Sequence, residues 1–178
     1  RALARTYALT STSHSIALEC ANRALEIATE ITKSDRDVGN ARYALADVYR
    51  HTGQIDKALH EFEHALEIGT RTDNYDLQLY ALLGKAACFL ATCDTNSLSR
   101  AVTALEELVA INESSPEYKI VKLFGLVEQR LNGKKCYSDK IDASFVVIGR
   151  PWTSELQSCL ADQTTDFKVL LKKLVVVL

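Results

Sequence analysis

Alanines and aromatic residues recur at a fixed interval through the first two thirds of the chain, and this period constrains the fold more than any other feature. Aromatic residues stand at positions 7, 49 and 89, which are 42 and 40 residues apart. Alanines stand at positions 17, 58 and 101, which are 41 and 43 residues apart. A period of roughly 20–50 residues is typical of repeat architectures. The period therefore predicts three copies of one structural unit over residues 1–112.

The residue types at the repeating positions fit close packing of helices. Small residues such as Ala46 and Ala58 let two helices approach to about 8–10 Å, while Tyr49 and Phe62 fill the space beside them. One such hairpin cannot cover its own apolar face, so about three must stack. The middle copy is the most complete and consists of Leu45-Ala46, Tyr49, Gly53, Ala58, Phe62 and Ala65-Leu66. The outer copies share its offsets.

Composition favours helices and excludes several classes of protein. The 178 residues are 47% hydrophobic and 25% charged, with only 7 Gly and 2 Pro, which is too few for a sandwich built on many tight turns. The formal net charge of −2 gives no support to a nucleic-acid or anionic-lipid surface. We therefore expect an all-α protein without a nucleic-acid partner.

Capping residues and glycines predict where the helices begin and end. Three segments have the pattern of a helix start, and three glycines suit helix ends. The starts are Ser34 with Asp37, Asp73 with Asp76, and Ser115-Pro116-Glu117; the glycines are Gly53, Gly69 and Gly133. The predicted helices span residues 1–10, 14–32, 36–51, 55–69, 75–92, 97–112 and 116–132.

The repeating pattern resembles the tetratricopeptide repeat (TPR) over residues 1–112, with copies at about 1–32, 36–69 and 75–112. Its length is similar to the long variety found in kinesin light chains, Pins-type adaptors and rapsyn. The resemblance implies a right-handed superhelix of stacked antiparallel helix hairpins. It also implies a noncatalytic scaffold or adaptor that holds a partner peptide or helix in its concave groove.

The last third of the chain departs from the repeat. After Gly133 the offsets are lost, and residues 167–178 form a very apolar segment. Because a solenoid needs its open end covered, we interpret residues 113–178 as a degenerate repeat followed by capping helices. The same segment suggests an alternative role. The chain would then be a structural assembly segment of a larger complex, and its apolar C-terminal helix would contact the rest of that complex or a second copy of the chain.

The first helix of each hairpin is expected to line the groove, with side chains recurring at i, i+4 and i+7. The predicted partner-binding residues are Arg5, Asn40, Tyr43, Asp47, Arg50 and Tyr80. Arginines can hold carboxylates bidentately, so the partner is expected to be a protein or peptide of acidic character opposite Arg1, Arg5 and Arg50. Asn40 can pair with a peptide backbone, and the tyrosines supply contact area.

The chain also contains one motif that is typical of zinc hydrolases. The sequence His60-Glu61-Phe62-Glu63-His64 matches HExxH, in which two imidazoles bind zinc and the glutamate activates water. A zinc site needs a third protein ligand, and no histidine follows His64. Phe62 is moreover accounted for as a core residue. We therefore expect no enzyme, no metal and no cofactor, and keep a zinc hydrolase only as a remote alternative.

Cysteine usage and hydropathy bear on the compartment. The five cysteines are an odd number without a CxxC pair, which favours reduced thiols and a cytoplasmic or nuclear location. No apolar run reaches the length of about 18 residues that a membrane span needs, and nothing in the sequence has the pattern of a signal peptide. The chain opens with Arg1 and contains no methionine, so we interpret it as a piece of a longer protein.

Overall fold

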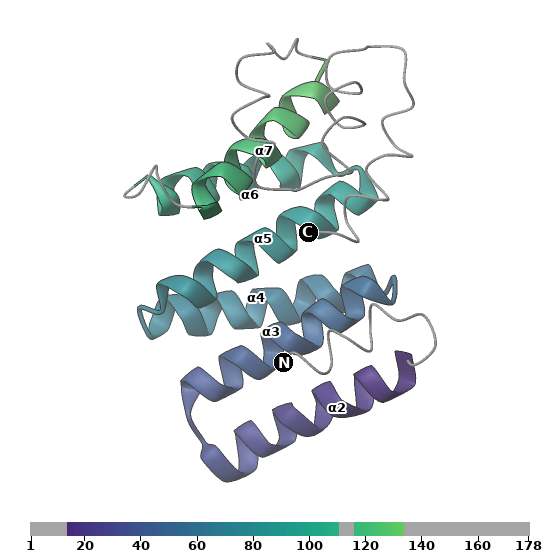
Figure 1. Cartoon of the computed structure of the whole chain (residues 1–178), viewed down its shortest axis with the longest axis vertical. Coiled ribbons are helices and arrows are strands. Elements are labelled where there is room, and N and C mark those ends of the chain that lie inside the picture. Colours follow the sequence, from purple (N-terminus) through teal and green to yellow (C-terminus); the bar gives the residue numbers. More distant parts are fainter. Residues whose placement is uncertain (1–13, 111–115, 134–178) are drawn as a thin grey trace. The chain divides into compact units, whose positions relative to one another are not determined.

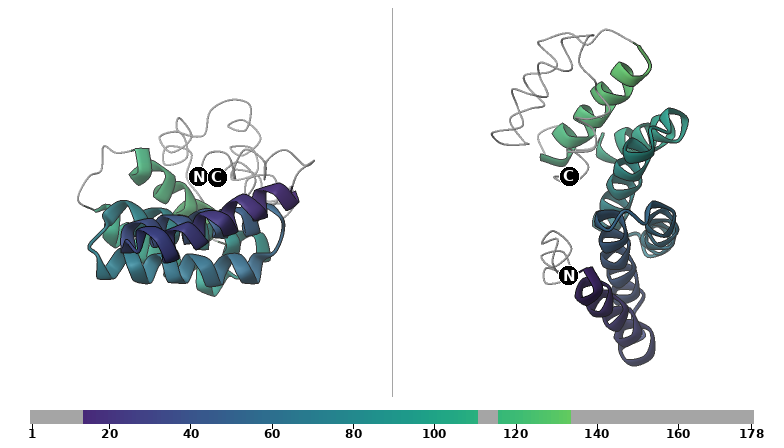
Figure 2. Two further views of the ribbon diagram at one scale, coloured as in Figure 1. Left: turned by 90° about the horizontal axis from the view of Figure 1, so that it is seen from below. Right: turned by 90° about the vertical axis from the view of Figure 1, so that its right-hand side faces the viewer.

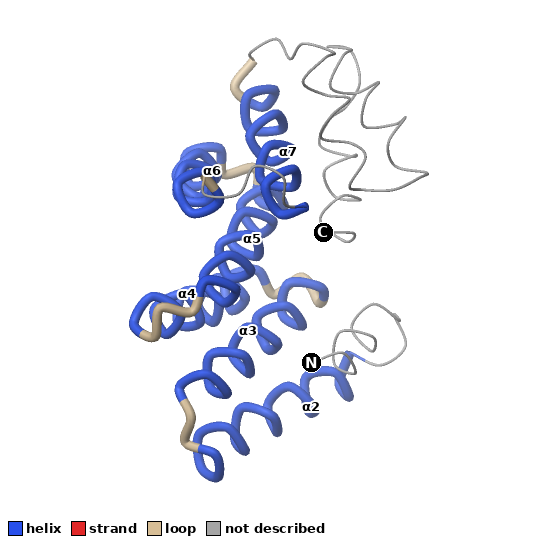
Figure 3. Tube along the Cα trace, turned by 60° about the vertical axis from the view of Figure 1, so that its left-hand side comes forward, coloured by secondary structure: helices blue, strands red, loops and turns tan. Residues whose placement is uncertain are grey.

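The computed structural model describes residues 14–110 and 116–133, and within these ranges the regular elements are helices, without a strand. Figures 1 and 3 show their course. The elements are α2 (His14–Ile27), the π-helix η1 (Ala28–Thr32), α3 (Asp35–His51), α4 (Ile55–Arg71), α5 (Tyr75–Thr92), α6 (Thr95–Val109) and α7 (Pro116–Leu131). For this part of the chain, the prediction of an all-α fold built from consecutive packed helix pairs is confirmed. The predicted helix 1–10 and the C-terminal capping helix lie outside the described residues.

The chain divides into two units, residues 1–88 and 89–178, with the boundary inside α5. In the first unit, α2 packs on α3, and α4 lies against α3 as the other arm of a hairpin (Figure 2). The alanines of the repeat pattern make these approaches: Ala17 and Ala58 have no exposed surface. Ala46 on α3 is equally buried and shares a cluster with Ala58. The period thus marks the positions at which helices touch.

Phe62 fills the space between three helices of the first unit. Its ring is fully buried in a cluster with Ala46 of α3 and Cys88 of α5. Gly84 of α5 lies directly over this ring, since a Cβ built on Gly84 would stand 2.3 Å from Cζ of Phe62. The absence of a side chain at position 84 is therefore what lets α5 pack on α4.

Most helix ends follow the capping residues of the sequence. The side chain of Ser34 accepts a hydrogen bond of 3.4 Å from the backbone N–H of Asp37, as predicted. The start of α5 corrects a prediction: Asn74 is the cap and accepts from the N–H of Leu77 at 3.2 Å. Asp73 instead has a left-handed backbone with φ of 51°.

Two of the three glycines end helices as predicted, whereas Gly69 and the end of the predicted helix 14–32 differ from the prediction. Gly53 and Gly133 follow helices with φ of 76° and 75°, a conformation that glycine adopts without strain. Gly69, predicted as a helix end, lies inside α4, and its carbonyl accepts a hydrogen bond of 3.2 Å from Gln78 of α5. The predicted helix 14–32 is α-helical only to Ile27 and closes as a π-helix before Lys33.

In the second unit, α6 packs against α7. The side chain of Asp94 caps α6 by accepting from the N–H of Ser97 at 3.1 Å, so the helix begins before the predicted residue 97. Leu105 of α6 and Phe124 of α7 are buried. A Cβ added to Gly125 of α7 would be in ordinary van der Waals contact, 3.7 Å from a methyl group of Val102.

Candidate functional site

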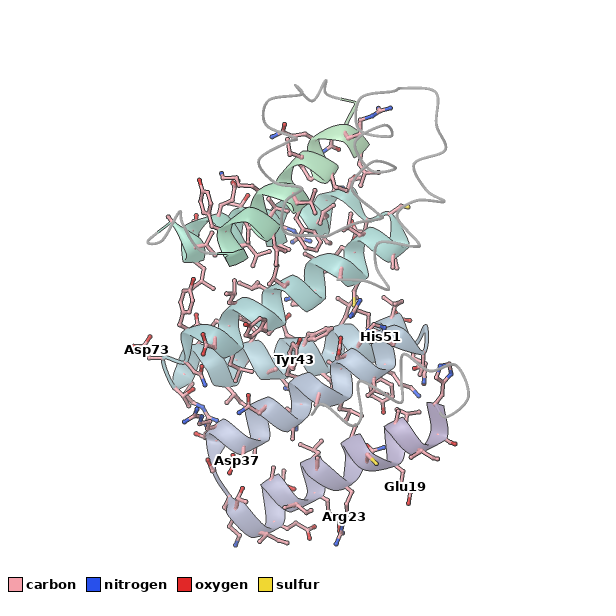
Figure 4. All side chains as sticks on the ribbon, in the orientation of Figure 1. Glu19, Arg23, Asp37, Tyr43, His51 and Asp73 are labelled. Atoms are coloured by element: carbon pink, nitrogen blue, oxygen red, sulfur yellow. The ribbon has the colours of Figure 1, made fainter. Side chains whose placement is uncertain are left out.

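Two of the predicted partner-binding residues, Tyr43 and Tyr80, come together between α3 and α5. Their ring centroids are 6.2 Å apart, and the Tyr43 ring also lies 5.7 Å from that of Phe62 (Figure 4 labels Tyr43). Tyr80 is 38% exposed, while Tyr43 and Asn40 are half-buried. The two tyrosines and Asn40, which lies one helical turn before Tyr43, are named here the tyrosine surface. Tyr43 connects the tyrosine surface to the core, because its ring packs against the buried ring of Phe62.

Asp47 and Arg50, predicted on the same face, lie in the interior instead. Each is only 5% exposed. Nη2 of Arg50 donates to Oδ1 of Asp47 at 2.8 Å, and also to Nε2 of His51 at 2.9 Å. Because a guanidinium can only donate, Nε2 of His51 is the acceptor in this contact. These side chains therefore form a buried polar cluster at the end of α3, where Figure 4 labels His51.

Burial of Asp47 and Arg50 also bears on the expected character of the partner. The charge of Arg50 is balanced by Asp47 at 2.8 Å. Arg1 and Arg5 lie outside the described residues. The preference for an acidic partner therefore stays a prediction from the sequence.

Cys88 of α5 lies near the charged groups of Arg50 and Asp47. It is fully buried, and burial raises the pKa of its thiol to about 12, opposed by the nearby positive charge of Arg50. A thiol with so high a pKa carries almost no thiolate at neutral pH, and the thiolate is the nucleophile. Cys88 therefore behaves as a small apolar core residue, whereas Cys93 is exposed.

The HExxH residues lie on α4 without the arrangement of a hydrolase. Glu61, the residue that would activate water, is held by Arg42 of α3 at 2.7 Å and is mostly buried. His60 and His64 stand on the exposed side of α4 with ring centroids 4.5 Å apart. Across residues 14–110 and 116–133, no group of three or more metal-ligating side chains occurs. The same part of the chain has no helix long and apolar enough to cross a membrane.

Sequence reasoning missed the ion pairs that join successive helices. Arg42 of α3 pairs with Glu61 of α4, and Lys85 of α5 pairs with Glu63 of α4. Their separations of 19 and 22 residues carry no local signal. The cluster of Asp47, Arg50 and His51 did carry one, because residues at i, i+3 and i+4 share a helix face.

Comparison with known protein families finds a match over this part of the chain. The model of the tetratricopeptide repeat family matches residues 37–114. The match supports a tetratricopeptide-repeat protein. TPR units generally mediate protein–protein interaction, and proteins of the family are typically noncatalytic scaffolds. No curated protein and no solved structure matches the chain. The narrower likeness to kinesin light chains, Pins-type adaptors and rapsyn, and the repeat boundaries, stay predictions.

Proposed function

We propose that this TPR chain is a noncatalytic adaptor that holds a peptide or helix of a partner protein on the tyrosine surface. The observation that carries the proposal is the contact between Tyr43 and Tyr80, whose centroids are 6.2 Å apart. It joins α3 and α5 in a single aromatic platform. A platform of this kind can contact a chain laid across both helices.

The chemistry of the tyrosine surface suits protein recognition. Tyrosine supplies a large rigid contact area and a hydroxyl, and it loses little conformational entropy on binding. Asn40 offers both a donor and an acceptor to a peptide backbone. Tyr43 is held in place by Phe62, so the platform is preorganised, which lowers the entropic cost of binding. The proposed location of the protein is the cytoplasm or nucleus, where free thiols such as that of Cys93 stay reduced.

The test uses peptides selected from a random display library on the full chain. Tyr80→Ala removes the exposed half of the platform and should weaken the selected peptides about 30-fold, the effect of losing about 2 kcal/mol at an interface hot spot. Tyr75→Ala is the matched control, because Tyr75 lies on the same helix and is equally exposed, at 40% against 38%. Affinity is measured by fluorescence anisotropy.

Two results would contradict the proposal. Selected peptides that bind Tyr80→Ala as tightly as the unaltered chain would remove the platform from the binding site. A selection that yields no peptide above background would speak against a peptide-binding role. Far-UV circular dichroism of both variants establishes that the helices are intact.

A further inference from the structure

Two histidines stand one helical turn apart on the exposed side of α4, and the tyrosine surface makes no use of them. The side chains of His60 and His64 are 67% and 39% exposed. Their ring centroids are 4.5 Å apart, and the ring planes meet at 81°. Phe62 between them in the sequence points into the core, which places the imidazoles on the opposite side of the helix.

Each imidazole has a carboxylate beside the same ring nitrogen. Nδ1 of His60 lies 3.4 Å from Oε1 of Glu61, and Nδ1 of His64 lies 3.3 Å from Oε2 of Glu67. An ionised carboxylate can only accept, so each contact favours the tautomer with the proton on Nδ1. The lone pair of a neutral imidazole is then on Nε2. In that tautomer, Nε2 is the nitrogen that can ligate a metal.

The supporting carboxylates reproduce the outer shell of protein metal sites. Metal-binding histidines commonly donate their other N–H to a carboxylate, which fixes the ring and raises its basicity. Glu61 is itself held by Arg42 of α3 at 2.7 Å, so the outer shell is anchored to a second helix. The contacts at 3.3 and 3.4 Å are long for hydrogen bonds and orient the rings weakly.

We propose that His60 and His64 form a two-imidazole chelate for a divalent late transition-metal ion of the Ni²⁺, Cu²⁺ and Zn²⁺ class. These ions prefer imidazole nitrogen, whereas Mg²⁺ and Ca²⁺ prefer oxygen ligands. Two nitrogens that each bind at about 2.1 Å lie about 3.4 Å apart in a tetrahedral site. The ring centroids are 4.5 Å apart, and metal binding requires the side chains to rotate until the two Nε2 atoms stand at that spacing.

The chelate is open and noncatalytic. The described residues offer no third ligand that completes a cluster, so water or a group from another molecule fills the remaining positions. Glu61 is paired with Arg42 and is not available to activate water. The site therefore binds metal on the surface of α4, independently of the proposed peptide-binding function.

The experiment is a calorimetric titration of the tag-free full chain with NiCl₂. The unaltered chain should bind one ion through the histidine pair. His60→Gln and His64→Gln should each weaken Ni²⁺ affinity at least about tenfold, because each leaves one imidazole in place of a chelate. His14→Gln is the matched control: His14 is exposed and lies on α2, so its loss should leave the affinity unchanged. All variants retain the same cysteines, so differences among them report the histidines.

A variant with relocated histidine separates chelation from histidine content. His64→Gln combined with Glu67→His keeps four histidines but sets the pair at i and i+7, about 10.5 Å apart along the helix. Its Ni²⁺ affinity should match that of His60→Gln. Equal affinity for the unaltered chain and His60→Gln, an equal loss in His14→Gln, or full binding by the i,i+7 variant would each overturn the proposal. Retained metal binding in Tyr80→Ala would show that the two surfaces are independent.

Discussion

Gly84→Ala tests whether the contact between α4 and α5 depends on the absence of a side chain. A Cβ at position 84 would lie 2.3 Å from Cζ and 2.4 Å from Cε1 of Phe62. Carbon atoms pack at about 3.5–4.0 Å, so the ring would have to withdraw by about 1 Å. Ala46, Ala58 and Cys88 surround the ring and are fully buried, which leaves it no room.

The magnitude follows from two opposing effects. Overpacking a tight core costs typically about 1–3 kcal/mol, and the fixed ring of Phe62 places this site at the upper end. Alanine favours a helix interior over glycine by about 1 kcal/mol. The net expectation is a loss of about 2 kcal/mol in the free energy of unfolding, or roughly 4–8 °C in Tm for a chain of this length.

Urea unfolding followed by far-UV circular dichroism measures the change. Gly125→Ala is the control, since a Cβ there meets its neighbours at 3.7 Å and the helix-propensity gain stands alone. Gly125→Ala should therefore stabilise the chain by up to about 1 kcal/mol. Phe62→Leu should offset part of the Gly84→Ala loss in the double variant, because it removes ring atoms from the clash. A Gly84→Ala chain as stable as Gly125→Ala would refute the reasoning.

Three further outcomes follow from the described residues. Asp47→Ala should lower the free energy of unfolding by about 3 kcal/mol in urea, since it leaves the buried guanidinium at 2.8 Å without that carboxylate; a loss under about 1 kcal/mol would contradict this. Peptide mapping by mass spectrometry at about pH 8 should find Cys93 modified by a thiol reagent and Cys88 modified only in denaturant, because burial raises the pKa of Cys88 to about 12. Hydrogen bonds from Ser97 lower the pKa of Asp94 in the folded chain. The contribution of Asp94 to the free energy of unfolding is therefore fully present above the unfolded-state pKa near 4, and it is lost as the pH falls through the lower folded value. Asp94→Asn should cap α6 without titrating, and its stability should fall less steeply with acid over that range.

For residues 14–110 and 116–133, the sequence pattern was enough to predict the helices and several of their packing positions. Alanine at a helix contact has a local cause, because only a small side chain permits the approach, so Ala17 and Ala58 could be assigned to the core from the sequence alone. The start of α3 was predicted correctly, because the side chain of Ser34 accepts from the backbone N–H of Asp37. At Asp73-Asn74 two capping residues stand side by side, and the left-handed backbone of Asp73 selects the second.

The candidate site was predictable only in part, because the helical offset of a charged residue does not tell whether its side chain is exposed or buried against a neighbouring helix. Tyr43 and Tyr80 were placed on one face from their offsets, and their rings are 6.2 Å apart. Asp47 was assigned to the same face by the same rule, yet it is 5% exposed. Its burial depends on Arg50 one turn later, which balances its charge and allows both groups to leave water. A sequence rule that treats each charged residue singly misses such pairs.

Phe62 connects the two surfaces proposed for this chain. Its ring supports Tyr43 on one side of α4, while the residues two positions before and after it are the exposed histidines. A helix with an apolar residue every third or fourth position necessarily sets the residues at ±2 on the far side. The HExxH match thus arises from ordinary amphipathic spacing around a core phenylalanine, and the same spacing sets the two imidazole rings 4.5 Å apart. The motif is compatible with metal binding without catalysis, because the packing that buries Phe62 also ties Glu61 to Arg42.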